Sequence, residues 1–366
     1  MDGSAPTTDI SSTGTNGWNG WRVSPVEVTL WPSDTRSGVA ATYYIVDGGP
    51  THTYAGPFTV YPDGQHQISF WSVDNVGNTE VQKSSTVKID LEGPTIESAV
   101  SGPIGGNNYF TGPAQVSLTV TDDVSGLAYT DFQIDDGPTT AYYSAFSVTG
   151  EGTHLVKFWS TDMAGNVSAV STTVIKIDSI VPSTQATLSG TAGANGWNLG
   201  AVQVSLSAAD NLSGVQTTYY KVDGGTTKTY TGAFNVSGND LHTVNFWSVD
   251  KATNTETTRS VAVNIDPNTP NVTANASPAS APKSSNPVTV TVSGHVTDTI
   301  SGAASATYSV VDEYCVTQPS GSVVLQANGN YSFTLSLPAT RNVGDFDGHK
   351  YTITVRGYDQ AGNMAS

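Results

Sequence analysis

Apolar and polar residues alternate along many short stretches of this chain. Val26, Val28 and Leu30 alternate with polar neighbours, and Ile68 and Phe70 do the same further along. A period of two residues places successive side chains on opposite faces of a β-strand. Gly, Asn and Asp, which favour turns, separate these stretches, and no sustained apolar period of 3.6 residues indicates a helix. The pattern predicts an all-β protein.

One stretch of sequence returns at a fixed interval. The segment from Phe70 to Asn78 recurs from Phe158 and again from Phe246, so the interval is 88 residues both times (158 − 70 and 246 − 158). A fixed interval of this size indicates a repeat architecture. The Asp-x-x-Gly-Asn motif returns once more at Asp359, which is 21 residues after position 338, where the interval would place it.

The repeats predict tandem immunoglobulin-like β-sandwich domains in an extended array. About seven short strands in roughly 90 residues, with turns at regular spacing, are typical of this sandwich. We expect Ig-like repeats at residues 1–90, 91–178 and 179–266, and a divergent Ig-like domain at 267–366 that lacks its last strand. Short links that contain Pro94, Pro182 and Pro267 should make the array semi-rigid.

The charge of the chain limits the kinds of molecule that it is expected to bind. The net charge is −17, and only 12% of the residues are charged. A surface that binds nucleic acid or an anionic membrane needs clustered Lys and Arg, so neither is expected as a partner. The acidic balance is compatible with cation binding and also with plain solubility. No apolar run could span a bilayer. The single cysteine, Cys315, excludes an intrachain disulfide and leaves pairing between molecules open.

The repeated motifs resemble a known family. Asp-x-x-Ser-Gly at Asp122, Tyr-x-Val-Asp-Gly-Gly at Tyr44, Tyr-x-Gly-x-Phe at Tyr54 and Phe-x-Ser-x-Asp-x-x-Gly-Asn at Phe70 are similar to tandem Ig-like repeats of secreted bacterial multidomain proteins. The resemblance covers residues 2–266 well and the fourth unit weakly. It implies an extracellular, non-catalytic module, found both in stalks of surface proteins and in appendages of polysaccharide-degrading enzymes.

Catalysis is not expected. A nucleophile needs an adjacent base and an orienting group. Three of the six histidines, His66, His154 and His242, stand at the same position of each repeat. A residue that recurs in every unit is better explained by structure than by catalysis.

Repeated carboxylates are the candidate metal ligands. Asp34 and Asp74 end two strands that run the same way in an Ig topology, so both should meet at one pole of the sandwich. Asp90 leaves the opposite pole and should lie near Asp122, Asp123 and Asp162 of the next unit. The same reasoning brings Asp178 near Asp210 and Asp250, and Asp266 near Asp298 and Asp359. Such oxygen-rich junctions suit Ca²⁺, which takes six to eight oxygen ligands.

A second explanation of the same aspartates stays open. An Asp followed by x-x-Gly or x-x-Ser-Gly can accept backbone N–H bonds of its own loop. This turn chemistry accounts for the spacing without a metal.

Exposed aromatic residues are the candidate carbohydrate-binding positions. Trp71, Trp159 and Trp247 have outward parity, opposite Phe70 and its counterparts, and they could stack on sugar rings. Tyr43 and Tyr219 are outward on a neighbouring strand, and Trp31 occurs only in the first unit. The alternative is that these side chains pack against cross-strand neighbours.

The sequence thus predicts a non-enzymatic, extracellular or cell-surface stalk, spacer or adhesin segment, monomeric and part of a longer chain. The alternative is a carbohydrate-binding appendage of a secreted glycoside hydrolase. Polysaccharide or cell-surface components are the expected partners, and we expect either no cofactor or Ca²⁺ at the interdomain junctions. A third reading is that the incomplete fourth unit accepts a strand from another chain.

Overall fold

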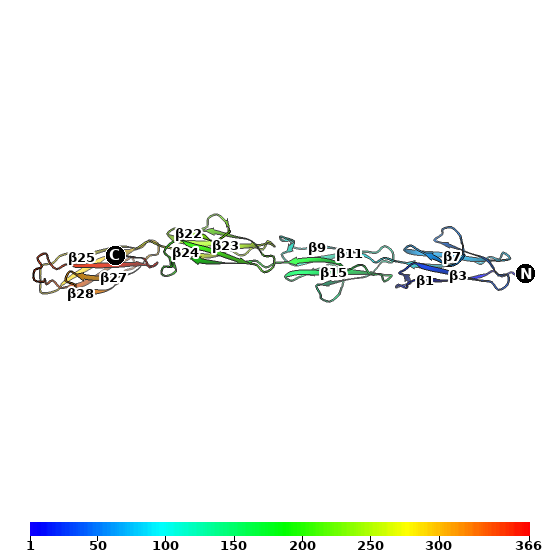
Figure 1. The fold of residues 1–366 in the computed structure, drawn as a ribbon, viewed down its shortest axis with the longest axis horizontal. Helices are drawn as coiled ribbons and strands as arrows, with labels where there is room; N and C mark the ends of the chain where they lie inside the picture. Colours follow the sequence, from blue (N-terminus) through cyan, green and yellow to red (C-terminus); the bar gives the residue numbers. More distant parts are fainter. The chain divides into compact units, whose positions relative to one another are not determined.

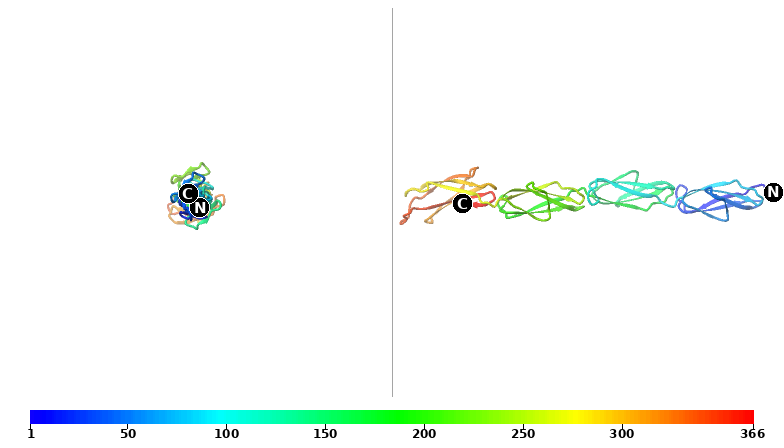
Figure 2. Two further views of the ribbon diagram at one scale, coloured as in Figure 1. Left: turned by 90° about the vertical axis from the view of Figure 1, so that its right-hand side faces the viewer. Right: turned by 90° about the horizontal axis from the view of Figure 1, so that it is seen from above.

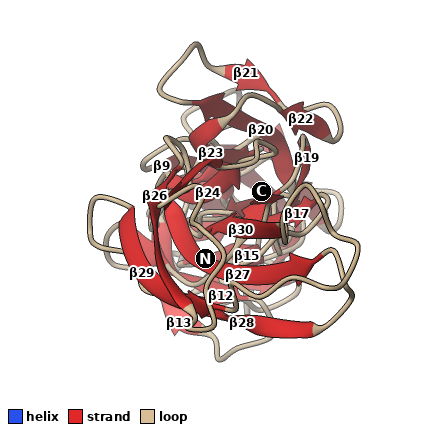
Figure 3. Cartoon of the chain, turned by 90° about the vertical axis from the view of Figure 1, so that its left-hand side faces the viewer, coloured by secondary structure: helices blue, strands red, loops and turns tan.

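The alternating segments are strands in the computed structural model, which describes every residue from Met1 to Ser366. All regular elements are β-strands, as Figure 3 shows. The chain divides into two compact units, Met1–Ser179 and Ile180–Ser366. We call the paired sheets of residues 1–90, 91–178, 179–266 and 267–366 the first, second, third and fourth sandwich, and each unit holds two of them (Figure 1). The fold is therefore a series of tandem β-sandwiches.

The strand bounds repeat with the sequence. The first sandwich contains β1 (Thr7–Thr13), β2 (Trp21–Arg22), β3 (Val26–Ser33), β4 (Val39–Val46), β5 (His52–Thr53), β6 (Phe58–Val60), β7 (Gly64–Asp74) and β8 (Lys83–Ile89). The second contains β9 (Thr95–Ser101), β10 (Tyr109–Phe110), β11 (Ala114–Thr121), β12 (Leu127–Ile134), β13 (Thr140–Ala141), β14 (Phe146–Val148), β15 (Gly152–Asp162) and β16 (Ser171–Ile177). The third contains β17 (Ser183–Ser189), β18 (Trp197–Asn198), β19 (Val202–Ala209), β20 (Val215–Val222), β21 (Lys228–Thr229), β22 (Phe234–Val236), β23 (Asp240–Asp250) and β24 (Arg259–Ile265). The fourth contains β25 (Asn271–Ser277), β26 (Val288–Thr297), β27 (Ala303–Asp312), β28 (Thr317–Val323), β29 (Asn330–Leu337), β30 (Tyr351–Asp359) and β31 (Met364–Ala365).

The first three sandwiches share one topology. In the first, a three-stranded sheet of order β1-β3-β6 packs on a five-stranded sheet of order β2-β8-β7-β4-β5. β7 lies between β8 and β4 and is antiparallel to both, whereas β2 joins β8 in parallel. The strands of each sandwich run side by side along its longer dimension (Figure 2). The strands named β8, β16 and β24 close the larger sheet, and we call them the closing strands.

Alternation accounts for the cores. Val26 and Val28 on β3 face Ile68 on β7 and Ile89 on β8, and all four are fully buried while the residues between them are more exposed. Burial of each such side chain contributes about 1.5–3 kcal/mol. The Asp47-Gly48 turn predicted from sequence connects β4 to β5 with positive φ at both residues (52° and 70°), as a type I′ turn requires.

A buried polar network joins the two sheets of the first sandwich. Glu80 is only 8% exposed, and its carboxylate accepts hydrogen bonds from the backbone N–H (2.9 Å) and the hydroxyl (2.6 Å) of Thr8 on β1. The same carboxylate accepts the backbone N–H of Ser72 on β7 at 3.2 Å. Thr184 and Glu256 repeat this arrangement in the third sandwich. The second sandwich has Ile96 and Ser168 at the corresponding positions.

The fourth sandwich departs from this plan. Its sheets have the orders β25-β26-β29 and β28-β27-β30-β31. β30 corresponds to β7, because both end in the Asp of the Asp-x-x-Gly-Asn motif and both pair with the preceding long strand. No strand among residues 267–366 corresponds to β8, and β31 pairs with β30 only at Gly357 and Tyr358.

Candidate cation-binding junctions

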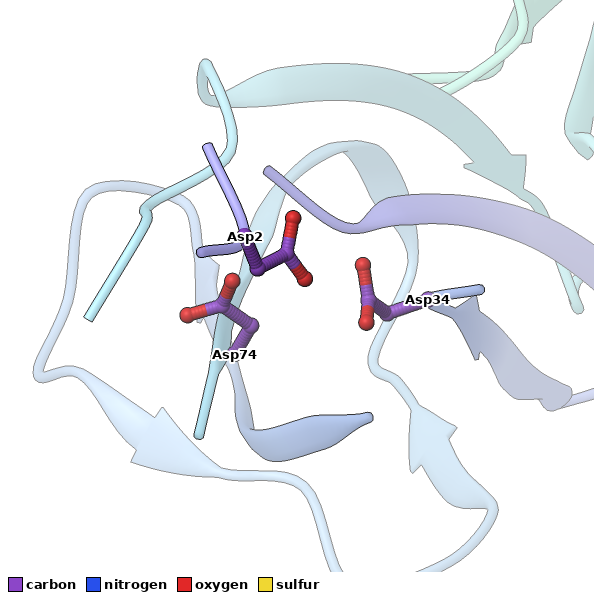
Figure 4. Close-up of side chains that lie close together, drawn as sticks. All are labelled: Asp2, Asp34 and Asp74. Atoms are coloured by element: carbon purple, nitrogen blue, oxygen red, sulfur yellow. The ribbon is translucent and has the colours of Figure 1, made fainter. Parts of the chain in front are cut away.

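Carboxylates from distant parts of the sequence meet at one pole of three sandwiches. Within the first unit, Asp2, Asp34 and Asp74 form one group, and Asp90, Asp122 and Asp162 form a second; within the second unit, Asp266, Asp298 and Asp359 form a third. In each group the three oxygen atoms lie within 4.8 Å of one another. Figure 4 shows the first group, whose carboxylates point into a shared space. We call these groups the acidic clusters.

The strand plan explains why the members meet. Asp34 follows β3, and Asp74 is the last residue of β7, so both stand at the same pole. Asp90 directly follows β8 at the opposite pole and enters the second sandwich, where Asp122 and Asp162 occupy the positions of Asp34 and Asp74. The Asp90 and Asp266 clusters are therefore built by the link from one sandwich and two strand ends of the next, whereas Asp2 of the N-terminal segment completes the first cluster.

The loop-capping role predicted for these aspartates is confirmed. Asp34 Oδ1 accepts the backbone N–H of Gly38 at 2.7 Å, and Asp74 Oδ1 accepts that of Asn78 at 2.7 Å. Asp122 Oδ1 accepts the N–H of Gly126 at 2.6 Å. Oδ1 is thus committed to the loop in each case. Oδ2 of Asp74 accepts the Asn78 side chain, but Oδ2 of Asp210 is buried without a hydrogen-bond partner.

The equivalent aspartates of two clusters, Asp2 and Asp90, differ in the direction of their pKa shift. Burial raises the pKa of Asp90, and the charges of Asp122 and Asp162 raise it further, although a hydrogen bond from Ser125 opposes the change. By contrast, a backbone hydrogen bond from Ser4 lowers the pKa of Asp2, which is more exposed. The Asp90 cluster, in which Asp90 and Asp162 are buried and Asp122 is partly buried, therefore concentrates negative charge, and none of its members is a cationic side chain that would neutralise this charge.

Two further contacts fix each junction inside a unit. The Asn166 side chain donates to the backbone carbonyls of Asp90 (3.0 Å) and Glu92 (3.3 Å), which belong to the link between sandwiches. Asn363 donates in the same way to the carbonyl of Asp266 at 3.0 Å. The amide of the motif Asp-x-x-Gly-Asn thus holds the incoming chain against the pole.

A hairpin tip of the preceding sandwich supplies the second contact, and our sequence reasoning did not find it. The backbone N–H of Trp18 donates to the carbonyl of Ala164 at 2.7 Å, and the Asn19 side chain donates to that of Met163 at 2.9 Å. In the second unit, the Ala194 N–H donates to the carbonyl of Ala361 at 2.7 Å. The signal was the repeated Asn-Gly-Trp at 19–21 and 195–197, with φ of 54° and 51° at the two asparagines.

The donor set of the clusters fits a hard cation such as Ca²⁺. Three carboxylates and no Lys, Arg or His make up each group, and at least two members are buried in the Asp90 and Asp266 clusters. Ca²⁺ is bound by carboxylate and carbonyl oxygens at about 2.3–2.6 Å. Carboxylates this close repel one another unless a proton or a cation intervenes.

One predicted ligand lies outside all such groups. Asp123 is exposed and not part of the Asp90 cluster, because the loop turns at Asp122 and directs the next side chain to solvent. Asp178 is buried directly after β16 in the first unit, whereas Asp210 and Asp250 belong to the second unit, where they cap loops through Gly214 and Asn254.

The candidate aromatic residues divide into two kinds. Trp71, Trp159 and Trp247 alternate with buried Phe residues and are partly buried. Trp71 stacks on its cross-strand partner Tyr43 with ring centroids 5.6 Å apart, and Trp247 stacks on Tyr219 at 5.7 Å.

Trp31 is different, because 60% of its surface is exposed and its indole N–H donates to Ser11.

Comparisons with known proteins found similar solved structures but no family. No family model and no curated protein matches the chain. Among solved structures it is similar to fibronectin(III)-like modules of Clostridium thermocellum CbhA (14% identity, covering 47% of this chain and 94% of that chain, TM-score 0.23). It is also similar to the D00-D0 domain of intimin (14% identity, 46% and 100% covered, TM-score 0.25) and to domains of titin (11% identity, 75% and 95% covered, TM-score 0.29). The fold assignment rests on the strand order and cores described above. No helix of the structure is long and apolar enough to cross a membrane.

Proposed function

We propose that the chain is a non-catalytic spacer or stalk segment of a secreted or cell-surface protein. The observation that supports this most is the junction inside each unit, where two separate segments of one sandwich contact the next. The link is held by Asn166 in the first unit and by Asn363 in the second, and a hairpin tip docks on the same loop. Two attachment points resist bending better than a single flexible linker does.

The repeated histidines support a structural role as well. His66 Nδ1 lies 2.7 Å from the Asp47 carboxylate, and its Nε2 lies 2.8 Å from the carbonyl of Pro62. His154 and His242 make the same carboxylate contact with Asp135 and Asp223. Each histidine therefore fastens a turn to the long central strand, and this explains its recurrence without catalysis.

The stiffness of the first junction can be tested with one glycine. A Cβ at Gly17 would lie 2.3 Å from the carbonyl oxygen of Ala164, so Gly17→Ala should separate the hairpin tip from the second sandwich. The measurement is the distance distribution between spin labels at Thr51→Cys and Thr139→Cys in a Cys315→Ser background. Gly17→Ala should broaden the distribution, whereas the control Gly232→Ala, which has open space around its Cβ, should not. An unchanged width in Gly17→Ala would count against a stiff junction.

We further propose that the acidic clusters bind Ca²⁺ and stiffen the junctions. Asp122→Asn separates this role from loop capping, because the amide keeps an oxygen that can accept the Gly126 N–H while one charge is lost. In chelator, Asp122→Asn should raise the stability of the junction, since it removes repulsion of Asp90 and Asp162. In Ca²⁺ it should lower stability and Ca²⁺ affinity. The neighbouring Asp123→Asn is the matched control and should change neither.

Calorimetric titration and thermal melting in chelator and in Ca²⁺ measure this pair of effects. The same sign of change in both conditions would refute the metal role and leave the aspartates as loop caps.

A second candidate function is binding of polysaccharide. The observation that favours it is the pair of half-buried aromatic platforms, Tyr43–Trp71 and Tyr219–Trp247, together with the exposed Trp31. Aromatic faces of this kind suit stacking against apolar faces of sugar rings. Co-sedimentation with insoluble polysaccharides should then decrease in Trp31→Ala and Trp71→Ala. The absence of binding in the parent chain would exclude this function.

A further inference from the structure

The outer face of the smaller sheet in the first sandwich carries the most exposed tryptophan of the chain, Trp31. It lies on β3 directly across from Asp9 on β1, and their neighbours Leu30 and Ile10 face the core. The indole N–H donates to Ser11 Oγ at 3.0 Å. This bond engages the only polar atom of the indole, so the exposed part of the side chain is apolar ring surface. We call the outward side chains of β1, β3 and β6 the Trp31 face.

The Trp31 face is anionic and otherwise rich in hydroxyl groups. Asp9 and Glu27 are exposed on it, and the remaining outward side chains of its three strands are serines and threonines. Neither carboxylate forms an ion pair. Lys83 donates to the backbone carbonyl of Thr8, next to Asp9, but its charge pairs with Glu80. The face therefore presents an aromatic ring beside carboxylates that no cationic side chain neutralises.

The other sandwiches show that the strand pair itself does not require this set of side chains. At the position of Trp31 they have Thr119 and Ser207. Directly across from these residues stand Glu97 in the second sandwich and Gln185 in the third, in the same register. The second sandwich thus keeps a carboxylate without the ring, and the third has neither. The combination in the first sandwich is an addition to the fold and needs another explanation.

The sign of the charge separates Trp31 from another aromatic platform of the chain. Trp247, on the larger sheet of the third sandwich, has the ammonium group of Lys221 5.6 Å from its ring centroid. A cation in this position is attracted by the negative face of the ring. No cation of the protein lies over the ring of Trp31. The exposed ring and its carboxylates are therefore open to a cation of the ligand.

A sugar ring that carries an ammonium group matches each of these features. Its apolar C–H face can stack on the indole, as its hydroxyls bond to the serines and threonines around it. Its ammonium group is attracted by both the ring and the Asp9 carboxylate. Glu27 lies four residues before Trp31 on β3, or about 13 Å along the strand, so a chain of such sugars can reach it too. A folded protein is a poorer match, because interfaces have an apolar core and this face has one apolar side chain.

We propose that the Trp31 face binds a polysaccharide whose sugar units carry free amino groups. Trp31 stacks on one sugar ring, Asp9 pairs with the ammonium group of that unit, and Glu27 pairs with a unit further along. This assignment rests on the second candidate function, binding of polysaccharide, and names the class of ligand and the face that takes it.

Titration calorimetry of the full chain with two oligosaccharides tests the proposal. Linear hexamers of glucosamine and of N-acetylglucosamine share the same ring, but at about pH 5.5 only the first carries ammonium groups. The glucosamine hexamer should bind at one site per chain and about tenfold more tightly than the acetylated hexamer. Its affinity should also fall as salt is added, because salt screens exposed charges.

Variants of the face separate stacking from charge. Trp31→Ala should weaken binding of the glucosamine hexamer about tenfold, whereas Trp31→Tyr keeps an aromatic ring and should retain most of the affinity. Asp9→Asn should weaken it about fourfold. Glu97→Gln removes a carboxylate from the same position of the second sandwich and is the matched control, which should change nothing. Unchanged hydrogen-exchange protection of residues 64–74 shows that the first sandwich remains folded in each variant.

The third sandwich allows the face to be built where it is absent. Gln185→Asp, Gln203→Glu and Ser207→Trp place the three side chains at the corresponding positions. Thr187 stands at the position of Ser11 and offers a hydroxyl to the new indole. The triple variant should bind two glucosamine hexamers per chain. A single site in this variant would show that the three side chains do not make the site, and would overturn the proposal.

The other negative results can be told apart. If neither hexamer binds but insoluble polysaccharides still co-sediment with the chain, the proposal is wrong and the polysaccharide function stands; if nothing binds, both are wrong. Equal binding of the two hexamers would overturn the amino-group assignment alone. Binding that survives Trp31→Ala, or that weakens equally in Glu97→Gln, would mean attraction by the net negative charge and would overturn the site. A lysine hexamer that binds as tightly and is lost in Trp31→Ala would identify basic peptides as the ligand and overturn the sugar assignment.

Discussion

The buried network around Glu80 allows a prediction whose magnitude follows from the structure. The Glu80 carboxylate accepts three hydrogen bonds from Thr8 and Ser72, and Lys83 lies 2.9 Å away. Glu80→Ser removes the acceptor of the buried Thr8 N–H. The exchanged serine can still accept the Ser72 N–H, as Ser168 does from Ser160 at 3.0 Å. The lost charge-assisted bonds amount to about 3 kcal/mol of stability in the first sandwich.

The second sandwich suggests the compensating change. Ile96 and Ser168 stand there in place of Thr8 and Glu80. Thr8→Ile alone sets an apolar side chain against a buried carboxylate and should cost about 2 kcal/mol. In the double variant no buried charge remains, and the aliphatic side chain packs as Ile96 does. We expect the double variant to lose only about 1 kcal/mol of stability, whereas the losses of the two single variants add up to roughly 5 kcal/mol. The coupling energy between the two substitutions is therefore several kcal/mol.

Native-state hydrogen exchange of the full chain provides the assay. Protection of residues 64–74 reports opening of the first sandwich, and residues 240–250 of the third sandwich serve as the internal control in the same sample. Protection should fall in both single variants and recover in the double variant, without change at 240–250. Additive losses would refute the reasoning, because they would mean that the carboxylate and Thr8 do not act together.

Three further predictions concern other buried groups of the first unit. Burial would lower the pKa of His66, but hydrogen bonds and the charge of Asp47 outweigh this and raise it above 6.5. The stabilisation is therefore present below pH 6.5 and lost as pH rises through the folded value, so His66→Gln should destabilise the first sandwich more at about pH 5.5 than at about pH 8 in chemical denaturation. Ile68→Ala should cost about 2–5 kcal/mol in the same sandwich by hydrogen exchange, since the side chain is fully buried. Because the pKa of Asp90 is raised, Ca²⁺ binding at acidic pH, where part of this carboxyl is protonated, should release more protons than it does in Asp90→Asn, and calorimetry in buffers of different ionisation enthalpy should detect them.

The fold could be predicted in large part because its determinants are local and repeated. Alternation placed Ile68, Phe70 and Ile89 in the core, and a period of 88 residues set the three copies in register. The Asp47-Gly48 turn followed from residues that tolerate positive φ. The prediction that Trp71 lies on the face opposite Phe70 was also correct. Its degree of burial could not be predicted, because the burial depends on Tyr43, directly opposite on the neighbouring strand.

The junction contacts were harder to predict. Trp18 and Asn19 contact residues about 145 positions away through backbone carbonyls, which carry no side-chain signature. Gly17 has a φ that any residue can adopt, and its identity is required only by the close approach of Ala164. Pattern-based reasoning identifies turns and core faces, but it does not identify glycines whose constraint comes from another domain.

Loop capping and cluster formation have one structural cause. The Asp after β3 and the Asp that ends β7 each use Oδ1 to accept an N–H four residues ahead, and this fixes both side chains at the same pole. The link from the preceding sandwich must enter at that pole, so its own buried aspartate completes the group. A chain that uses Asp for these turns therefore gathers carboxylates at the junction inside each unit, whether or not a metal binds there. The diagnostic measurement is therefore the change in stability caused by Asp122→Asn, which removes a charge but keeps the loop cap. Only a bound cation makes this change differ in sign between chelator and Ca²⁺.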